Sequence, residues 1–212
     1  MPKTLRTRKP LPFCGVAPRV SPGSGPAADL FRASTGMADS EQLPLVADTI
    51  RQLRDIGFQP VLVGGMALVI MGSLRVTRDF DFVIAHPADR LDHVVEVFYD
   101  RGFELVSRLN EAGDVTATID NRRIASARLR LDRPTSAYFY SVAKRVRIDL
   151  LFDFPLPAIE LLKKAKRAKI LSHVFDIASP EDLLRLKELA QASRSFAGDA
   201  QDIEFLKRHV RT

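Results

Sequence analysis

Apolar side chains recur every three or four residues in several parts of this chain, which is the spacing of a helix with one buried face. Between residues 41 and 57, that face would carry Leu45, Ile50 and Leu53. At Ser179 the segment SPEDLLRLKEL adds start signals, because Ser caps a helix, Pro suits its first position and acids suit its first turn. The pattern predicts helices over 41–56, 66–72, 89–100, 179–192 and 199–209, and permits another between Pro157 and Lys166.

Other segments alternate apolar and polar positions, or are short and apolar, as β-strands are. They lie at 59–63, 80–84, 103–109, 115–119 and 123–131, within 141–154, and at 174–178 as a short strand or extended link. Within 141–154, Arg147 and Asp149 share one face and the apolar residues share the other. This order of elements predicts an α+β domain with a C-terminal helical tail.

The first 36 residues differ in composition from the remainder of the chain. Six of the thirteen prolines fall within the first 26 residues, and no apolar period is present there. We expect residues 1–36 to be disordered, or to precede a true translation start at Met37. Residues 37–154 then form the core domain, and residues 155–212 a C-terminal helical region.

The segment VLVGGMALVIMGSLRVTRDFDFV, residues 61–83, joins a diglycine turn to two aspartates on a strand. Side chains two apart on a strand point to the same face, about 6.5 to 7 Å apart, so Asp79 and Asp81 form a carboxylate pair. Two such carboxylates repel each other unless a cation lies between them, and Mg²⁺ binds carboxylates together with substrate phosphates. Gly64 and Gly65 remove side chains where a phosphate could approach the start of a helix. The segment therefore predicts a site for a nucleoside triphosphate and its divalent metals.

Asp149 is the third candidate carboxylate. It lies in the middle of the strand RVRIDLL, where an acid needs a metal or an ion pair. The alternative to a metal ligand is therefore a salt bridge with Arg147 or a neighbouring Arg. Ser73 and Arg75 are candidate phosphate contacts, with Thr77 beside them as a secondary candidate.

The net charge of +6 is unevenly distributed along the chain. Residues 121–169 contain thirteen Lys or Arg against four Asp or Glu, a net charge of +9. Such a block predicts either a basic surface for nucleic acid phosphates or the solvated faces of ordinary helices and strands. The single cysteine, Cys14, excludes an internal disulfide, and the longest apolar runs are too short to span a membrane. We therefore expect a cytoplasmic protein.

The diglycine, thirteen intervening residues, Asp-x-Asp and a distant third Asp on a strand together resemble the nucleotidyltransferase superfamily related to DNA polymerase β. The segments RVTRDFD, RIDLLFDF, ASPEDLLRLKELA and DAQDI are more closely similar to AbiEii-type nucleotidyltransferases, which are toxins of type IV toxin–antitoxin systems. The resemblance covers about residues 45–210. It implies a nucleotidyltransferase fold, in which helices flank a small mixed sheet and a helical tail follows.

The resemblance also implies roles for residues that the sequence pattern would leave as solvated helix positions. Lys187 would reach the nucleotide, and Asp199 and Asp202 correspond to a closing D-x-x-D-I element. The family's more usual Gly-Ser is Gly64-Gly65 here, so a Ser contact to phosphate is missing at that spot.

We therefore expect a metal-dependent enzyme that moves a nucleoside monophosphate from a nucleoside triphosphate to a hydroxyl acceptor, with two Mg²⁺ held by Asp79, Asp81 and Asp149. The nucleotide-binding candidates are Gly64, Gly65, Ser73, Arg75 and Lys187. The resemblance implies RNA, such as transfer RNA, as acceptor, and an antitoxin as partner. The alternatives are transfer to a small molecule, as in antibiotic modification, transfer to a protein, and a catalytically silent module that only binds.

Overall fold

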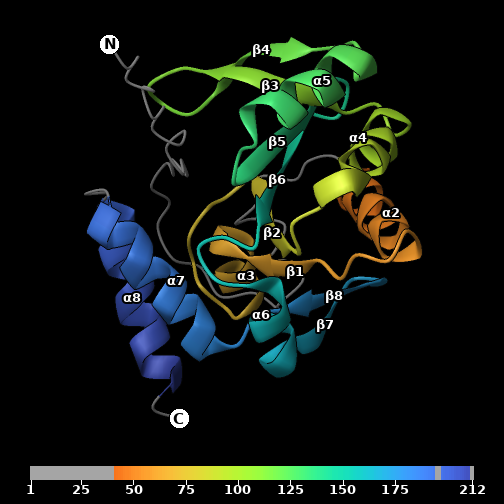
Figure 1. Ribbon diagram of the computed structural model, residues 1–212. Helices are drawn as coiled ribbons and strands as arrows, with labels where there is room; N and C mark the ends of the chain where they lie inside the picture. Colours follow the sequence, from red (N-terminus) through yellow and green to blue (C-terminus); the bar gives the residue numbers. More distant parts are fainter. Residues whose placement is uncertain (1–40, 194–196, 211–212) are drawn as a thin grey trace, which may run out of the picture.

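The computed structural model describes residues 41–193 and 197–210, which form one eight-stranded mixed sheet with helices packed around it (Figure 1). The segment 1–36 lies outside the described residues. The strands are β1 Val61–Val63, β2 Asp79–Ile84, β3 Glu104–Leu109, β4 Val115–Ile119, β5 Ser136–Ser141, β6 Val146–Phe152, β7 Lys166–Ile170 and β8 His173–Ile177. The helices are α2 Gln42–Asp55, α3 Gly64–Ile70, η1 Ala88–Arg90, α4 Leu91–Tyr99, α5 Arg122–Asp132, α6 Ala158–Lys164, α7 Pro180–Ser193 and α8 Ala197–Val210. Within these ranges, none of the helices is long and apolar enough to cross a membrane.

The sheet has the strand order β4-β3-β5-β6-β2-β1-β8-β7. β2 pairs in parallel with β6 and β1 in parallel with β8, while the remaining neighbours are antiparallel. The hairpin β7–β8 belongs to the C-terminal part of the chain and extends the sheet beyond β1. The middle of the sheet therefore consists of β6, β2 and β1, which carry the predicted carboxylates and the diglycine.

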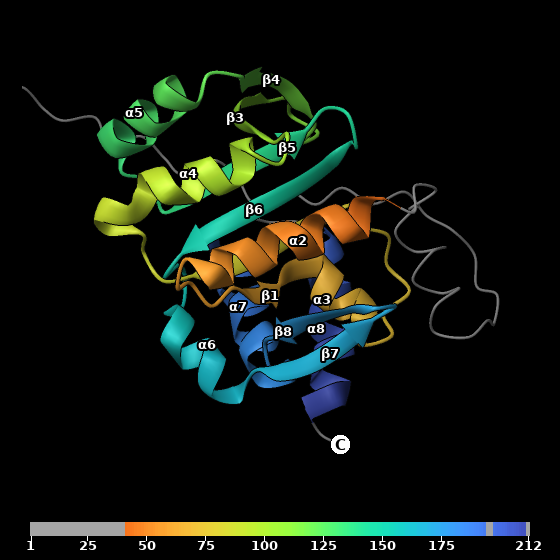
Figure 2. The ribbon, with the colours of Figure 1, turned by 90° about the vertical axis from the view of Figure 1, so that its right-hand side faces the viewer.

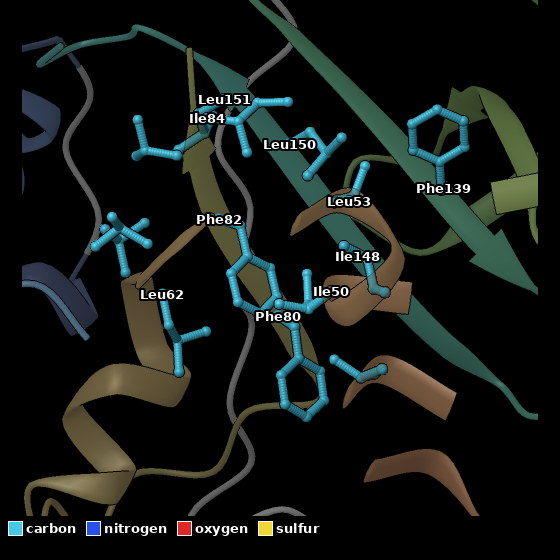
Figure 3. Packing of buried hydrophobic residues seen from close by; sticks show 14 of the residues in the cluster. Ile50, Leu53, Leu62, Phe80, Phe82, Ile84, Phe139, Ile148, Leu150 and Leu151 are labelled. Carbon is cyan, nitrogen blue, oxygen red and sulfur yellow. The ribbon is translucent and has the colours of Figure 1, made fainter. Parts of the chain in front are cut away.

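One face of these central strands is closed by apolar packing. Helices α2 and α4 lie across it (Figure 2). Phe80, Phe82, Ile148 and Leu150 are fully buried and gather around Ile50 of α2 (Figure 3). Each such side chain contributes roughly 1.5 to 3 kcal/mol when buried. Because side chains alternate along a strand, this burial directs the residues between them, including Asp81 and Asp149, to the opposite face.

The predicted α+β fold with C-terminal helices is confirmed, as are the predicted helices at 41–56, 89–100 and 179–192 within one or two residues. The start of α7 shows why the last of these was predictable. The Ser179 hydroxyl accepts a hydrogen bond from the Asp182 N–H at 3.2 Å and donates one to the Asp182 carboxylate at 2.9 Å. Such a cap satisfies a backbone donor that the first turn leaves unpaired.

The predicted strand at 123–131 is wrong, because this segment is helix α5. The Asn121 side chain caps the helix by accepting from the N–H groups of Arg123 and Ile124. Only a narrow stripe of α5 is buried, and Leu131 is 83% exposed, so the alternation of Leu and Arg does not reflect two faces of a strand. The missing strand is β5, which follows α5 and was not predicted. Similarly, the helix expected to reach Lys166 ends at Lys164, and Lys166 is the first residue of strand β7.

Candidate active site

Four charged side chains lie on the polar face of the central strands. The parallel register of β2 and β6 places Asp79 beside Arg147, and Asp81 beside Asp149. Neighbouring strands are about 4.8 Å apart, so the three predicted carboxylates and one guanidinium occupy adjacent positions on one surface. Asp81, Arg147 and Asp149 are buried, with 7%, 6% and 4% of their surfaces exposed. The structure thus brings the three predicted aspartates together.

Arg147 lies between two of these carboxylates. Its Nε donates to Asp149 Oδ1 at 2.8 Å, and one terminal nitrogen donates to Asp79 Oδ2 at 2.6 Å. The other terminal nitrogen donates to the Gly113 carbonyl at 2.9 Å, in the turn between β3 and β4. The salt bridge between Arg147 and Asp149, which the sequence left as the alternative to a metal ligand, is therefore present.

Burial and mutual repulsion change the acidity of this cluster. Burial raises the pKa of Asp79 to about 6, although the positive charge of Arg147 acts in the opposite direction. Burial also raises the pKa of Asp149 well above its ordinary value, again against the attraction of Arg147. Burial would lower the pKa of Arg147, but Asp149, Asp79 and Asp81 outweigh it and the pKa is raised. Arg147 therefore stays charged, while Asp79 and Asp149 bind protons more readily than surface aspartates do.

Gly64 makes close contact with Asp81. Gly64 follows the last residue of β1 and begins α3, with a φ of +68° that favours glycine. A Cβ at this position would overlap the Asp81 carboxylate, lying 2.6 Å from its Cγ. The predicted diglycine therefore does remove a side chain at the carboxylate cluster, and the group that fills the space is Asp81 itself.

Gly65 makes a second close approach, to the loop between α3 and β2. A Cβ on Gly65 would lie 2.9 Å from Arg75 Cζ and 3.0 Å from Thr77 Oγ1. In the same loop, the Ser73 hydroxyl is buried and accepts from the Arg75 N–H at 3.5 Å. Ser73, Arg75 and Thr77 are thus packed against the start of α3, beside the carboxylate cluster.

Lys187 is the centre of a buried ionic network. Its Nζ lies 3.1 Å from Asp199 Oδ1 and 2.6 Å from Asp202 Oδ2, and only 7% of its surface is exposed. Arg75 forms a further ion pair with Asp202. Helices α7 and α8 are thereby tied to the loop that precedes Asp79. The three residues carried over from the resemblance, Lys187, Asp199 and Asp202, do meet in space.

A pocket of about 300 Å³ lies beside the network. Gly64 and Lys187 both line it. Its other walls are apolar, from the end of β6, the following Phe154-Pro155 and one side of α7. Because Gly64 also contacts Asp81, the pocket opens beside the cluster. The three aspartates are not among its lining residues, so the pocket offers a lysine and apolar walls to a ligand.

The donor chemistry of the three aspartates suits Mg²⁺, since all their ligand atoms are carboxylate oxygens. In their present arrangement they are not gathered around a common point: across residues 41–193 and 197–210, no three His, Cys, Asp or Glu side chains form a group that could hold a metal ion. The contacts of Arg147 give the physical reason, because its guanidinium supplies the positive charge that Asp79 and Asp149 require. The three aspartates therefore have the ligand atoms that Mg²⁺ prefers. In this structure the positive charge beside Asp79 and Asp149 comes from Arg147.

The basic block at 121–169 does not form one continuous surface. Arg122, Arg128 and Arg130 on α5 are ion-paired, and Arg147 is buried. The other exposed cations lie apart, as Arg123, Arg133 and Arg145 do, or gather on α6 and the edge strand β7: Lys163, Lys164, Lys166, Arg167 and Lys169.

The role of Arg147 was not predicted beyond a pair with Asp149. The strand period places Arg147 on the same face as Asp149. It does not predict the hydrogen bonds of Arg147 to Asp79 and to the Gly113 carbonyl. Only the strand register and the position of the β3–β4 turn reveal them. The family resemblance implied a role for Lys187 at the nucleotide, but its burial was not predicted.

No protein-family model matches this sequence, and no curated protein matches it. Solved structures do. An antigenic nucleotidyltransferase-like protein from Paracoccidioides brasiliensis superposes with a TM-score of 0.50 and 21% identity, covering 79% of this chain and 76% of its own. The antibiotic-resistance factor ANT(2'')-Ia superposes with a TM-score of 0.51 and 11% identity, covering 81% of this chain and 85% of its own. The fold is that of the nucleotidyltransferases.

Proposed function

We propose that this protein, which has the nucleotidyltransferase fold, transfers a nucleoside monophosphate from a nucleoside triphosphate to a hydroxyl group. The observation that carries the proposal is the register of β2 and β6, which sets Asp79, Asp81 and Asp149 side by side next to Gly64. Three buried or half-buried carboxylates on one surface raise the energy of the folded protein. The cations of a bound triphosphate would offset this cost.

In this proposal, Asp79, Asp81 and Asp149 hold two Mg²⁺. When bound, the ions would neutralise the triphosphate and lower the pKa of the acceptor hydroxyl. The oxygen of that hydroxyl bonds to the α-phosphorus, and the bond from the α-phosphorus to the bridging oxygen breaks to release pyrophosphate. The hydroxyl proton passes to a carboxylate of this cluster, and we assign that role to Asp149.

The remaining residues bind and orient the donor. Lys187 lies in the wall of the 300 Å³ pocket and provides a positive charge for phosphate oxygens. Arg75 joins it through Asp202, so that the two cations and α8 act as one unit. Gly65, Ser73 and Thr77 keep the loop close to the start of α3. The apolar walls of the pocket exclude water from the organic part of the ligand.

RNA, including transfer RNA, is the first acceptor we propose. The five exposed cations at 163–169 form a short basic strip on α6 and β7 that could attract phosphates. Replacing Lys166 and Lys169 by Glu should then weaken RNA binding about tenfold and reduce its salt dependence. The matched control is Lys207→Glu, an exposed lysine on α8, which should leave RNA binding unchanged.

A small hydroxyl-bearing molecule is the second acceptor, and the apolar pocket beside Gly64 and Lys187 favours it. The two acceptors are separated by one screen. The protein is incubated with Mg²⁺, each α-³²P-labelled nucleoside triphosphate, and either total RNA or a panel of hydroxyl-bearing antibiotics. Label in RNA supports the first acceptor and label in an antibiotic the second. No Mg²⁺-dependent binding of any nucleoside triphosphate would overturn the proposal in favour of a silent binding module.

A toxin role follows only if RNA is the acceptor. Expression of the protein should then arrest growth, and Asp81→Asn should abolish the arrest. An antitoxin partner would be sought by co-expression of a gene encoded beside it. Normal growth with active RNA labelling would exclude the toxin role and leave the transferase proposal intact.

A further inference from the structure

Arg147 is enclosed by groups that would otherwise repel or remain unpaired. Its guanidinium contacts Asp149 at 2.8 Å, Asp79 at 2.6 Å and the Gly113 carbonyl at 2.9 Å, from a position that is 6% exposed. A guanidinium is planar and has five N–H donors, so it can join three acceptors in one plane, which a lysine cannot do. The ring of Tyr138 lies 6.0 Å away, on the neighbouring strand β5. Arg147 is therefore held in one position from several sides.

The two carboxylate oxygens that Arg147 contacts belong to two of the three proposed metal ligands. A buried carboxylate requires a positive partner, because isolated charge is strongly disfavoured away from water. Arg147 provides that partner in the structure described here. A divalent cation that bound Asp79 and Asp149 would meet the same requirement. Two cations that share the same carboxylates repel each other, so binding of the metal must weaken the ion pairs of Arg147.

The contact with Gly113 extends this arrangement to a second element. Residues 110–114 form the tight turn between β3 and β4, closed by hydrogen bonds between Asn110 and Asp114 and from the Gly113 N–H to the Asn110 carbonyl. Arg147 is 34 residues away in sequence and donates to this turn from inside the cluster. The turn is thus attached to the carboxylates through Arg147.

We propose that Arg147 is a positioning residue that takes the place of the metal before the metal arrives. It holds Asp79 and Asp149 in the cluster and fixes the turn 110–114, and a divalent cation binds by taking these carboxylates from it. The metal half of this inference rests on the proposed function, whereas the attachment of the turn does not.

The test compares Arg147→Met with the wild-type protein and with Arg130→Met. Arg130 is a matched control because it lies on the exposed surface of α5 and forms an ion pair with Asp92 of α4. Three quantities are measured without nucleotide: melting temperature, Mn²⁺ affinity by calorimetry, and amide hydrogen exchange in residues 110–114. We expect Arg147→Met to lower the melting temperature, to bind Mn²⁺ about tenfold more tightly, and to exchange faster in the turn. Arg130→Met should change none of the three by a comparable amount.

A lower melting temperature together with a higher Mn²⁺ affinity would identify Arg147 as a residue that competes with the metal. A residue that only supported the fold would lower stability and Mn²⁺ affinity together, and that result would overturn the proposal. Unchanged hydrogen exchange in the turn would overturn its attachment through Arg147. If neither protein bound Mn²⁺, the metal half and the proposed function would both fail, while faster exchange in Arg147→Met would still support the attachment of the turn.

Arg147→Lys provides a second test should the methionine variant not fold. Lysine keeps the charge but cannot contact Asp79, Asp149 and Gly113 together. The variant should therefore show fast exchange in the turn and a Mn²⁺ affinity between those of wild type and Arg147→Met. Wild-type exchange in Arg147→Lys would contradict the proposal.

Discussion

The contact between Gly64 and Asp81 predicts that the smallest substitution at Gly64 will both destabilise the protein and displace a catalytic carboxylate. In Gly64→Ala the new methyl group would lie 2.6 Å from Asp81 Cγ and 2.9 Å from Asp81 Cβ. Neither backbone can yield easily, because β1, β2 and α3 are buried around this point. The Asp81 side chain must therefore rotate away from its position beside Asp149.

The expected loss in the free energy of unfolding of Gly64→Ala has two parts. The first is the left-handed backbone at Gly64, with φ of +68°, which costs an alanine roughly 1 to 2 kcal/mol. The second is the overlap with Asp81, which as overpacking in a buried region costs about 1 to 3 kcal/mol. We expect a total loss of about 3 kcal/mol, or roughly 6 to 12 °C in Tm for a protein of this size.

The assay is urea unfolding of Gly64→Ala, with Gly102→Ala as the matched control. Gly102 has a similar φ of +73°, and a Cβ there would meet nothing within 4 Å. Gly102→Ala therefore has the cost of the left-handed backbone but no overlap, and its free energy of unfolding should fall by only about 1 to 2 kcal/mol. In the double variant Gly64→Ala/Asp81→Ala, most of the overlap is removed, and part of the stability lost in Gly64→Ala should return.

The same variants report on the site. Gly64→Ala should lose nucleotidyl transfer at temperatures where it remains folded, whereas Gly102→Ala should keep it. The reasoning would be refuted if Gly64→Ala lost no more stability than Gly102→Ala, or if the double variant were the sum of the two single ones.

Two further predictions concern charged groups. Lys187→Met leaves Asp199 and Asp202 buried without their lysine. Urea unfolding should therefore show a free energy of unfolding lower by about 3 to 5 kcal/mol. A loss below about 1 kcal/mol would contradict the stabilising role of these ion pairs. Because burial raises the pKa of Asp79 to about 6, protonation of Asp79 should weaken metal binding and transfer as the pH falls through 6, and a kcat/KM that is constant from pH 5 to 7 would contradict this. The same shift means that the folded protein binds a proton more tightly than the unfolded chain, so the contribution of Asp79 to stability should fall as the pH rises from about 4 to 6.

The sequence predicts best those parts of the fold where one local signal dominates. The apolar stripe of α2 and the Ser179 cap of α7 each determine their helix without reference to other elements. The segment of α5 fails because its apolar content is low, and what decides it is the Asn121 cap together with packing against α4. The alternating pattern there was accidental, since Leu131 faces solvent.

In the candidate site too, the sequence predicts what a local pattern determines and not what depends on strand pairing. Asp79 and Asp81 were placed on one face by the strand period, and Asp149 by the same argument on another strand. Which residues stand beside them depends on register, and register is set by pairing between strands far apart in sequence. For that reason the sequence could suggest an Arg147–Asp149 pair but not the enclosure of Arg147 by Asp79, Asp149 and Gly113.

The most direct test of the central claim follows the two ends of the triphosphate separately. Purified protein is incubated with Mg²⁺, total RNA or a small acceptor, and ATP labelled either at the α- or at the γ-phosphorus. We predict that the α-label enters the acceptor, that the γ-label leaves as pyrophosphate, and that Asp81→Asn abolishes both. The control Asp176→Asn, a carboxylate on β8 paired with Arg54, should retain both. Transfer of the γ-label to the acceptor, or equal transfer of the α-label by Asp81→Asn and wild type, would contradict the account.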